Sequence, residues 1–78
     1  MTAPAQPDPY LAAAVRRLRH ECEQTQEDLA HHADLTTSAL ARIERGKANP
    51  TWTTTRRIAL ALGVSLEELG RAVEEEGG

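Results

Sequence analysis

The sequence predicts an all-α fold made of five short helices. Apolar residues recur three and four positions apart, the spacing of an amphipathic helix, and no stretch shows the alternation of a half-buried strand. Five residues with capping side chains each precede a helical stretch and mark its start: Asp8, Thr25, Thr36, Thr51 and Ser65. A chain of 78 residues makes one domain, near the lower size limit for a self-sufficient core.

The first helix is expected from Pro9 to about Cys22. Asp8 can cap this helix, and proline suits its first position, where an N–H has no partner in the helix. Several prolines fall among the first nine residues, so residues 1–8 are expected to form a flexible tail ahead of a folded domain at 9–73. Four residues at helical spacing should face the core: Leu11, Val15, Leu18 and Cys22.

The second helix is expected over Gln26–Ala33. Thr25 can accept a hydrogen bond from its first turn, and Asp28, three residues later, completes an aspartate form of the capping box. A tight turn at Asp34–Leu35 follows this helix. The small side chain of Ala30 permits a close crossing with the next helix.

The third helix should begin after Thr36 and bury Leu40 and Ile43. The residues that then point outward are Thr37, Ser38, Ala41, Arg42 and Arg45. Two short helices around a tight turn are the layout of a helix-turn-helix, whose second helix lies in the major groove of DNA. Hydroxyls can bond base edges or phosphates, and arginine can bond the guanine edge in a bidentate manner. The alternative is that these residues form an ordinary solvated helix face. The basic loop that directly follows the helix makes this alternative less favoured.

The fourth helix should run over Trp52–Leu62, with Thr51 as its cap and Gly63 ending it in the left-handed conformation. Trp52 is expected in the core, because a lone tryptophan at an apolar helix position is more often buried than in contact with DNA.

The fifth helix should begin after Ser65, which can form a capping box with Glu68, and run to about Val73. Glutamates occupy positions 74 to 76. Their charge opposes the helix dipole, so residues 74–78 are expected to form a frayed acidic C-terminus.

The charge distribution indicates a polyanionic partner, although the net charge is −3. Between positions 36 and 57 the chain has five basic residues and a single acid, Glu44, which gives this segment a charge of +4. The basic residues are Arg42, Arg45, Lys47, Arg56 and Arg57. The local field, rather than the total charge, draws a polyanion such as DNA to a surface.

Residues 10 to 69 resemble the Cro/phage-repressor-type helix-turn-helix family of bacterial regulators, also called the xenobiotic-response-element family. Four motifs carry the resemblance: RRLR near the start, TQEDLA, TTSALARIERG with the KANP that follows, and ALGVSLEEL. The resemblance implies a compact five-helix bundle of the lambda-repressor-like type. It also implies operator binding as a dimer, to repress or activate transcription.

The candidate DNA-binding residues are Gln26, Thr36, Thr37, Ser38, Arg42, Arg45, Lys47 and Asn49. Those expected to read bases are Thr37, Ser38 and Arg42, while Arg45 can contact either bases or backbone. Lys47 and Asn49 are expected to contact phosphates, although plain turn chemistry also explains Asn49.

Two further roles follow from the resemblance. Gln26 matches a family glutamine that bonds a phosphate and a neighbouring side chain, at a helix N-terminus where anions are favoured. Arg19 and Glu44 match a family pair that forms a partly buried salt bridge between the first and third helices. The plain alternative for Gln26 is an ordinary polar residue in the first turn of a helix. The plain alternative for Arg19 and Glu44 is two unrelated surface charges.

The chain departs from the family pattern in ways that bear on stability and assembly. Glu23 and Asp34 stand where the family prefers glycine, and both should need a left-handed backbone at a cost of about 1 kcal/mol each. Leu60 stands where the family is usually polar. Together with Val64 it is expected to form a homodimer face on the fourth and fifth helices.

Several function classes fit the sequence poorly. With one cysteine, an internal disulfide is impossible. No zinc-ligand spacing, catalytic arrangement or phosphate-binding glycine loop stands out, so we expect neither an enzyme nor a cofactor or metal. The start of the chain does not resemble a signal peptide and the apolar runs are too short to span a bilayer, so we expect a cytoplasmic protein without membrane contact.

Two alternatives to a simple regulator stay open. The chain can be an antitoxin or a restriction-system controller that binds DNA and also a protein partner. It can also be a docking module that uses the same fold for protein contacts only.

Overall fold

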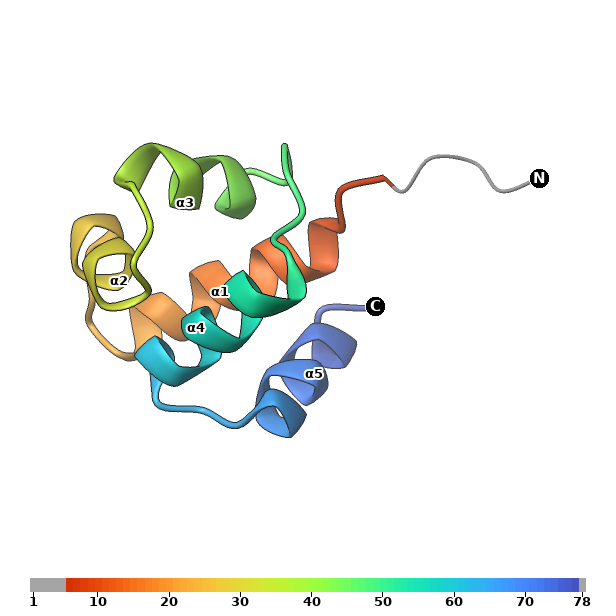
Figure 1. Ribbon diagram of the computed structural model, residues 1–78. Helices are drawn as coiled ribbons and strands as arrows, with labels where there is room; N and C mark the ends of the chain where they lie inside the picture. The colour runs from red at the N-terminus through yellow and green to blue at the C-terminus, as the bar shows by residue number, and fades with distance from the viewer. Residues whose placement is uncertain (1–5, 78) are drawn as a thin grey trace.

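The computed structural model describes residues 6–77, and five α-helices make up its regular structure. They are α1 Pro9–Glu21, α2 Gln26–His32, α3 Thr37–Glu44, α4 Trp52–Leu62 and α5 Leu66–Glu75. In Figure 1, α1 and α4 cross the middle of the bundle, α3 lies along one side, and α5 lies on the opposite side. The all-α fold class is therefore confirmed, and the helices start where the caps predicted.

The five capping residues all act as the sequence predicted. Each accepts a backbone N–H from the first turn of its helix through its side chain. Thr25–Asp28 and Ser65–Glu68 both form complete capping boxes. The backbone N–H of Thr25 donates to the Asp28 carboxylate, which lowers the pKa of that carboxyl below its usual value.

A small apolar core forms where the five helices meet, with Leu69 contributed by α5. Leu40 and Ile43 of α3 are 0% and 5% exposed, which confirms that this face points inward. Val15 is fully buried, whereas Leu11 and Leu18 are partly buried against the core. Ala30 is also buried, as a close crossing of α2 and α3 requires.

Two side chains that were expected in the core are exposed. Trp52 is 66% exposed, because it is the first residue of α4 and the buried positions of that helix begin only at Ile58. Cys22 is exposed because α1 ends one residue before it, and its thiol donates to the Leu62 carbonyl at 3.4 Å. In both cases the residue lies on the face of its helix that packs on the core. Helical periodicity predicts that face, but it does not show at which residue along the helix the contact with the core ends.

A buried ion pair joins α1 to α3. Arg19 Nε lies 2.8 Å from Glu44 Oε2, and Arg19 Nη2 lies 3.0 Å from Oε1 of the same carboxylate. Gln26 of α2 donates to that Oε1 at 3.1 Å. Glu44 is 1% exposed, so its charge is neutralised inside the bundle, where it connects three helices.

Both ends of the described segment are held more firmly than the sequence suggested. Asn49 bonds the backbone of Gln6 and Asp8, so the end of the expected tail is tied to the bundle, while residues 1–5 of that tail lie outside the described residues. At the other end α5 continues to Glu75, two residues past the expected Val73. Position 78 lies outside the described residues.

Arg17 of α1 explains the later end of α5. Its guanidinium lies 3.0 Å from Glu75 and 2.8 Å from Glu76, and it donates to the Ala72 carbonyl at 3.4 Å. A cation at this position offsets both the acidic side chains and the negative end of the helix dipole. The hydrogen bond to Glu76 is the main cause that raises the pKa of Arg17.

Replacement of Arg19 by alanine should lower the free energy of unfolding by about 3–5 kcal/mol, because it leaves the Glu44 carboxylate buried without its partner. The exposed pair Arg71–Glu67, with side chains 65% and 83% exposed, provides the control. Arg71→Ala should cost less than ~0.5 kcal/mol. Urea denaturation followed by circular dichroism measures both variants, and equal losses would contradict a structural role for the buried pair.

Glu23 and Asp34 have φ angles of 55° and 57°, which confirms the left-handed backbone expected at both positions. Glu23→Gly should therefore raise the free energy of unfolding by about 1 kcal/mol. Gly63→Ala is the opposite test, because Gly63 has φ of 72° and an added Cβ would meet nothing within 4 Å. Thermal unfolding should show a gain for the first variant and a loss for the second, and a loss for Glu23→Gly would refute the account.

Candidate nucleic-acid interface

The outer face of α3 consists of short polar and basic side chains. Thr37, Ser38 and Arg42 are all exposed, and Arg45 follows directly after the helix. The hydroxyls lie in the first turn and the guanidiniums lie toward the C-terminal end. The exposed face can therefore donate to and accept from base edges, and it can bond phosphates.

Thr36 has a structural task at the start of this helix. Its hydroxyl oxygen accepts the N–H of Ala39 at 3.0 Å and so caps α3. Its side chain is exposed, and its hydroxyl hydrogen has no acceptor among the described residues. The same residue can thus fix the start of α3 and donate one hydrogen bond outward.

The loop after α3 is packed against the start of α1. Gly46 has φ of 70°, and a Cβ at that position would lie 3.9 Å from Ala12 Cβ and 4.0 Å from Pro9 Cα. The Lys47 N–H donates to the Arg42 carbonyl at 2.9 Å, which closes the end of α3. Lys47 is therefore exposed on a loop that backbone contacts hold in place.

Asn49 binds the N-terminal segment with its side-chain amide. Its Oδ1 accepts the Asp8 N–H at 2.7 Å, and its Nδ2 donates to the Gln6 carbonyl at 2.9 Å. No pattern in the sequence indicates this link, because its partners lie more than forty positions away and use backbone groups. One Nδ2 hydrogen is left for an external acceptor.

Gln26 lies between the buried ion pair and the surface. It is the first residue of α2 and is half-buried, and its Nε2 donates to Glu44 Oε1 at 3.1 Å. Glu44 is thus the neighbouring side chain that the resemblance left unspecified. The amide oxygen and the second Nε2 hydrogen have no partner among the described residues, so Gln26 keeps both for another ligand.

The basic residues fall into two groups by their partners. Arg17, Arg19 and Arg71 form ion pairs with carboxylates. Within the described part of the chain, no salt bridge involves the remaining cations, which are Arg16, Arg42, Arg45, Lys47, Arg56 and Arg57. Five of these are the basic residues of the segment 36–57, and the lone acid of that segment is buried and paired. The segment therefore presents more positive charge to solvent than its sequence indicates.

Arg16 also belongs to this region, although its place in the sequence does not indicate it. It is exposed, and its Nη1 donates to the Glu44 carbonyl at 2.7 Å. It stands in the RRLR motif next to Arg17, which turns toward α5 instead. No pattern in the sequence separates the two arginines, because only the packing of α3 and α5 on α1 determines their directions.

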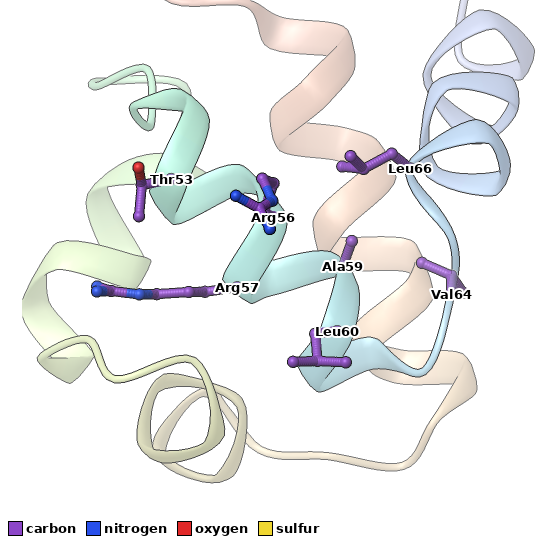
Figure 2. A pocket seen from close by; sticks show the side chains of 7 residues that line it. All are labelled: Thr53, Arg56, Arg57, Ala59, Leu60, Val64 and Leu66. Carbon is purple, nitrogen blue, oxygen red and sulfur yellow. The ribbon is translucent and has the colours of Figure 1, made fainter.

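A second exposed surface lies between α4 and the start of α5. A shallow groove of about 410 Å³ is lined by Thr53, Arg56, Arg57, Ala59, Leu60, Val64 and Leu66. Figure 2 shows Leu60 projecting from α4 at this groove, with Val64 on the segment between α4 and α5 and Leu66 at the start of α5. Leu60 is 81% exposed, and what distinguishes it from an ordinary exposed leucine is that it lies beside the other apolar side chains of this groove.

Two kinds of feature are not found among the described residues. Across positions 6–77, no three histidine, cysteine or acidic side chains are grouped so that they could hold a metal ion. None of the described helices combines the length and the apolar character that a bilayer crossing requires.

Comparisons with known proteins agree with this geometry. Residues 10–72 match the family model described as helix-turn-helix domain. The chain is 41% identical over 59 residues to y4dJ, an uncharacterised helix-turn-helix-type transcriptional regulator of Sinorhizobium fredii. This alignment covers 76% of this chain and 77% of that protein. The chain is also 38% identical over 55 residues to the immunity repressor protein of Bacillus phage phi105. That alignment covers 70% of this chain and 38% of the repressor.

The fold also matches that of a solved DNA complex. The restriction-modification controller protein C.Esp1396I, as a tetramer bound to its natural 35-base-pair operator, superposes with a TM-score of 0.84. The two chains share 26% sequence identity over 94% of this chain and 96% of that one.

Proposed function

Because this chain belongs to the helix-turn-helix family, and is a sequence-specific DNA-binding transcriptional regulator rather than an enzyme, we propose that it binds an inverted-repeat operator as a homodimer in the cytoplasm. One observation carries the proposal. Leu40 and Ile43 are buried, while Thr37, Ser38 and Arg42 on the opposite face of α3 are exposed beside cations that form no salt bridge within the described residues.

In this proposal α3 enters a major groove and reads base edges. The groove is about 12 Å wide, which admits a helix about 10–12 Å across. Thr37 and Ser38 approach the bases with their hydroxyls, and Arg42 reaches a guanine edge with two parallel hydrogen bonds. Arg45, at the end of the helix, contacts either a base or a phosphate.

The flanking residues hold the DNA backbone. Gln26 at the start of α2 donates its second Nε2 hydrogen to a phosphate, while Glu44 keeps its side chain in place. Lys47 supplies a charge from the packed loop, and Asn49 supplies the one Nδ2 hydrogen that the N-terminal segment leaves. Thr36 donates its hydroxyl hydrogen from the start of α3.

The homodimer forms through α4 and α5, with Leu60 of each subunit covering the groove of the other around Val64 and Leu66. The exposed leucine supports this assembly, because an apolar side chain beside an apolar groove gains free energy when both are covered. It also leaves both α3 helices free, because α3 and α5 lie on opposite sides of the bundle. The two half-sites are then separated by one turn of duplex, ~34–36 Å.

A more specific form of this function is favoured by the likeness to C.Esp1396I. That protein is a restriction-modification controller that binds its operator as a tetramer. As a controller of such a system, or as an antitoxin with a protein partner, this chain would bind DNA through the same face of α3.

The direct test of the whole proposal is to select bound sequences from a random DNA pool. Dyad symmetry in the selected sequences supports the proposal, and the absence of any preferred sequence contradicts it.

Arg42→Ala should cost about 1–3 kcal/mol of binding free energy on the selected operator and relax the preference at one base pair, because it removes a base contact. Lys47→Ala should weaken binding to operator and unrelated duplex by the same factor and flatten the salt dependence, because it removes a phosphate contact. Fluorescence anisotropy on both duplexes measures these effects. Equal losses on operator and unrelated DNA for Arg42→Ala would exclude base reading by that residue.

Leu60→Glu should convert the dimer to a monomer and lower operator affinity by at least tenfold, because the two half-sites would then bind separately. Trp52→Glu is the matched control, since Trp52 is also highly exposed but does not line the α4–α5 groove. Sedimentation at high micromolar concentration distinguishes the two assemblies. A monomeric parent protein, or a control variant that dissociates equally, would reject the α4–α5 interface.

A further inference from the structure

Adjacent arginines on α1 point toward opposite sides of the molecule. Arg17 reaches the end of α5, where its guanidinium lies within 3.2 Å of Glu21, Glu75 and Glu76. Arg16 reaches the end of α3, where its Nη1 donates to the Glu44 carbonyl at 2.7 Å. The two side chains share a charge and a helix, but only Arg17 is surrounded by carboxylates.

The acceptor that holds Arg16 is neutral. The last carbonyls of a helix have no N–H partner within it, and the Glu44 carbonyl accepts no backbone N–H among the described residues. The negative end of the α3 dipole also stabilises a guanidinium at this position. The contact uses one of five N–H donors, so Arg16 keeps its full charge and most of its hydrogen-bonding capacity.

Arg16 lies beside the proposed DNA-binding surface. Its partner Glu44 directly precedes Arg45 and the packed loop. On α1, Arg16 is one helical turn beyond Ala12, which contacts the Gly46 position of that loop. Since a helix nearly fills the width of the major groove, the phosphates of both strands pass close to the ends and sides of α3.

We propose that Arg16 is a further DNA-backbone contact, which the Glu44 carbonyl holds beside the end of α3. The proposal rests on the function above, in that α3 occupies a major groove. Arg16 adds a sixth unpaired cation to the basic residues of the segment 36–57, and it comes from a different helix. Because the hydrogen bond orients the guanidinium before DNA arrives, fewer side-chain rotamers are lost when the phosphate binds.

The charge of Arg16 is tested by titrating a mixed-sequence duplex over ~50–200 mM salt. Arg16→Met removes the charge, Arg16→Lys retains it, and Arg17→Met is the matched control on the same helix. Arg16→Met should lower the magnitude of the slope of log affinity against log salt by about 0.9 for each bound subunit, and weaken binding about five- to tenfold at ~0.1 M salt. Arg16→Lys should restore most of the slope, and Arg17→Met should leave it unchanged.

An unchanged slope for Arg16→Met, with normal salt-dependent binding by the parent protein, would overturn the assignment of Arg16 and leave the proposed function intact. No salt-dependent DNA affinity in the parent protein would instead overturn the proposed function. Thermal unfolding of each variant separates loss of the helix cap from loss of the phosphate contact, because capping moves the midpoint and not the slope. Should Arg16→Met fail to fold, Arg16→Gln gives the same test with a neutral donor in place.

Discussion

The position of α3 depends on the buried carboxylate of Glu44. Removing this charge from water is costly, and the cost is offset only because Arg19 and Gln26 together satisfy both carboxylate oxygens. The donors come from α1 and α2, so the pair fixes the angle at which α3 leaves the bundle. A hydrophobic residue at position 44 could fill the same volume but would not select one orientation. The backbone carbonyl of the same residue adds a further link to α1 through Arg16.

The separation of charge is the second feature on which function depends. The chain carries a net charge of −3, yet six of its nine Lys and Arg residues form no salt bridge among the described residues. Glu75 and Glu76 surround Arg17 at the end of α5, and Glu44 is buried. These acids are therefore buried or paired away from the cations of the segment 36–57, which lets an acidic protein present a basic surface to a polyanion.

The small core explains why local devices matter in this chain. The buried side chains of α1 include two alanines, Ala12 and Ala14, and the left-handed turns at Glu23 and Asp34 lack the glycine that would relieve them. In a domain with only about 5–10 kcal/mol of stability, five side-chain caps and a buried ion pair are a substantial share of the total. Burial of Leu60 in a homodimer would add apolar area that the monomer core lacks.

The sequence by itself determined the helices, their caps and the inward face of α3, because these depend on residues within one or two turns of each other. It also determined the left-handed turns at Glu23 and Asp34, and it located most of the basic surface. Only the tertiary structure decided where packing ends, which is why Trp52 and Cys22 are exposed against expectation. Only the tertiary structure decided that Asn49 holds the N-terminal segment and that Arg16 and Arg17 point toward different helices. Those contacts join groups that are far apart in the chain, and several of them use backbone atoms that every residue carries.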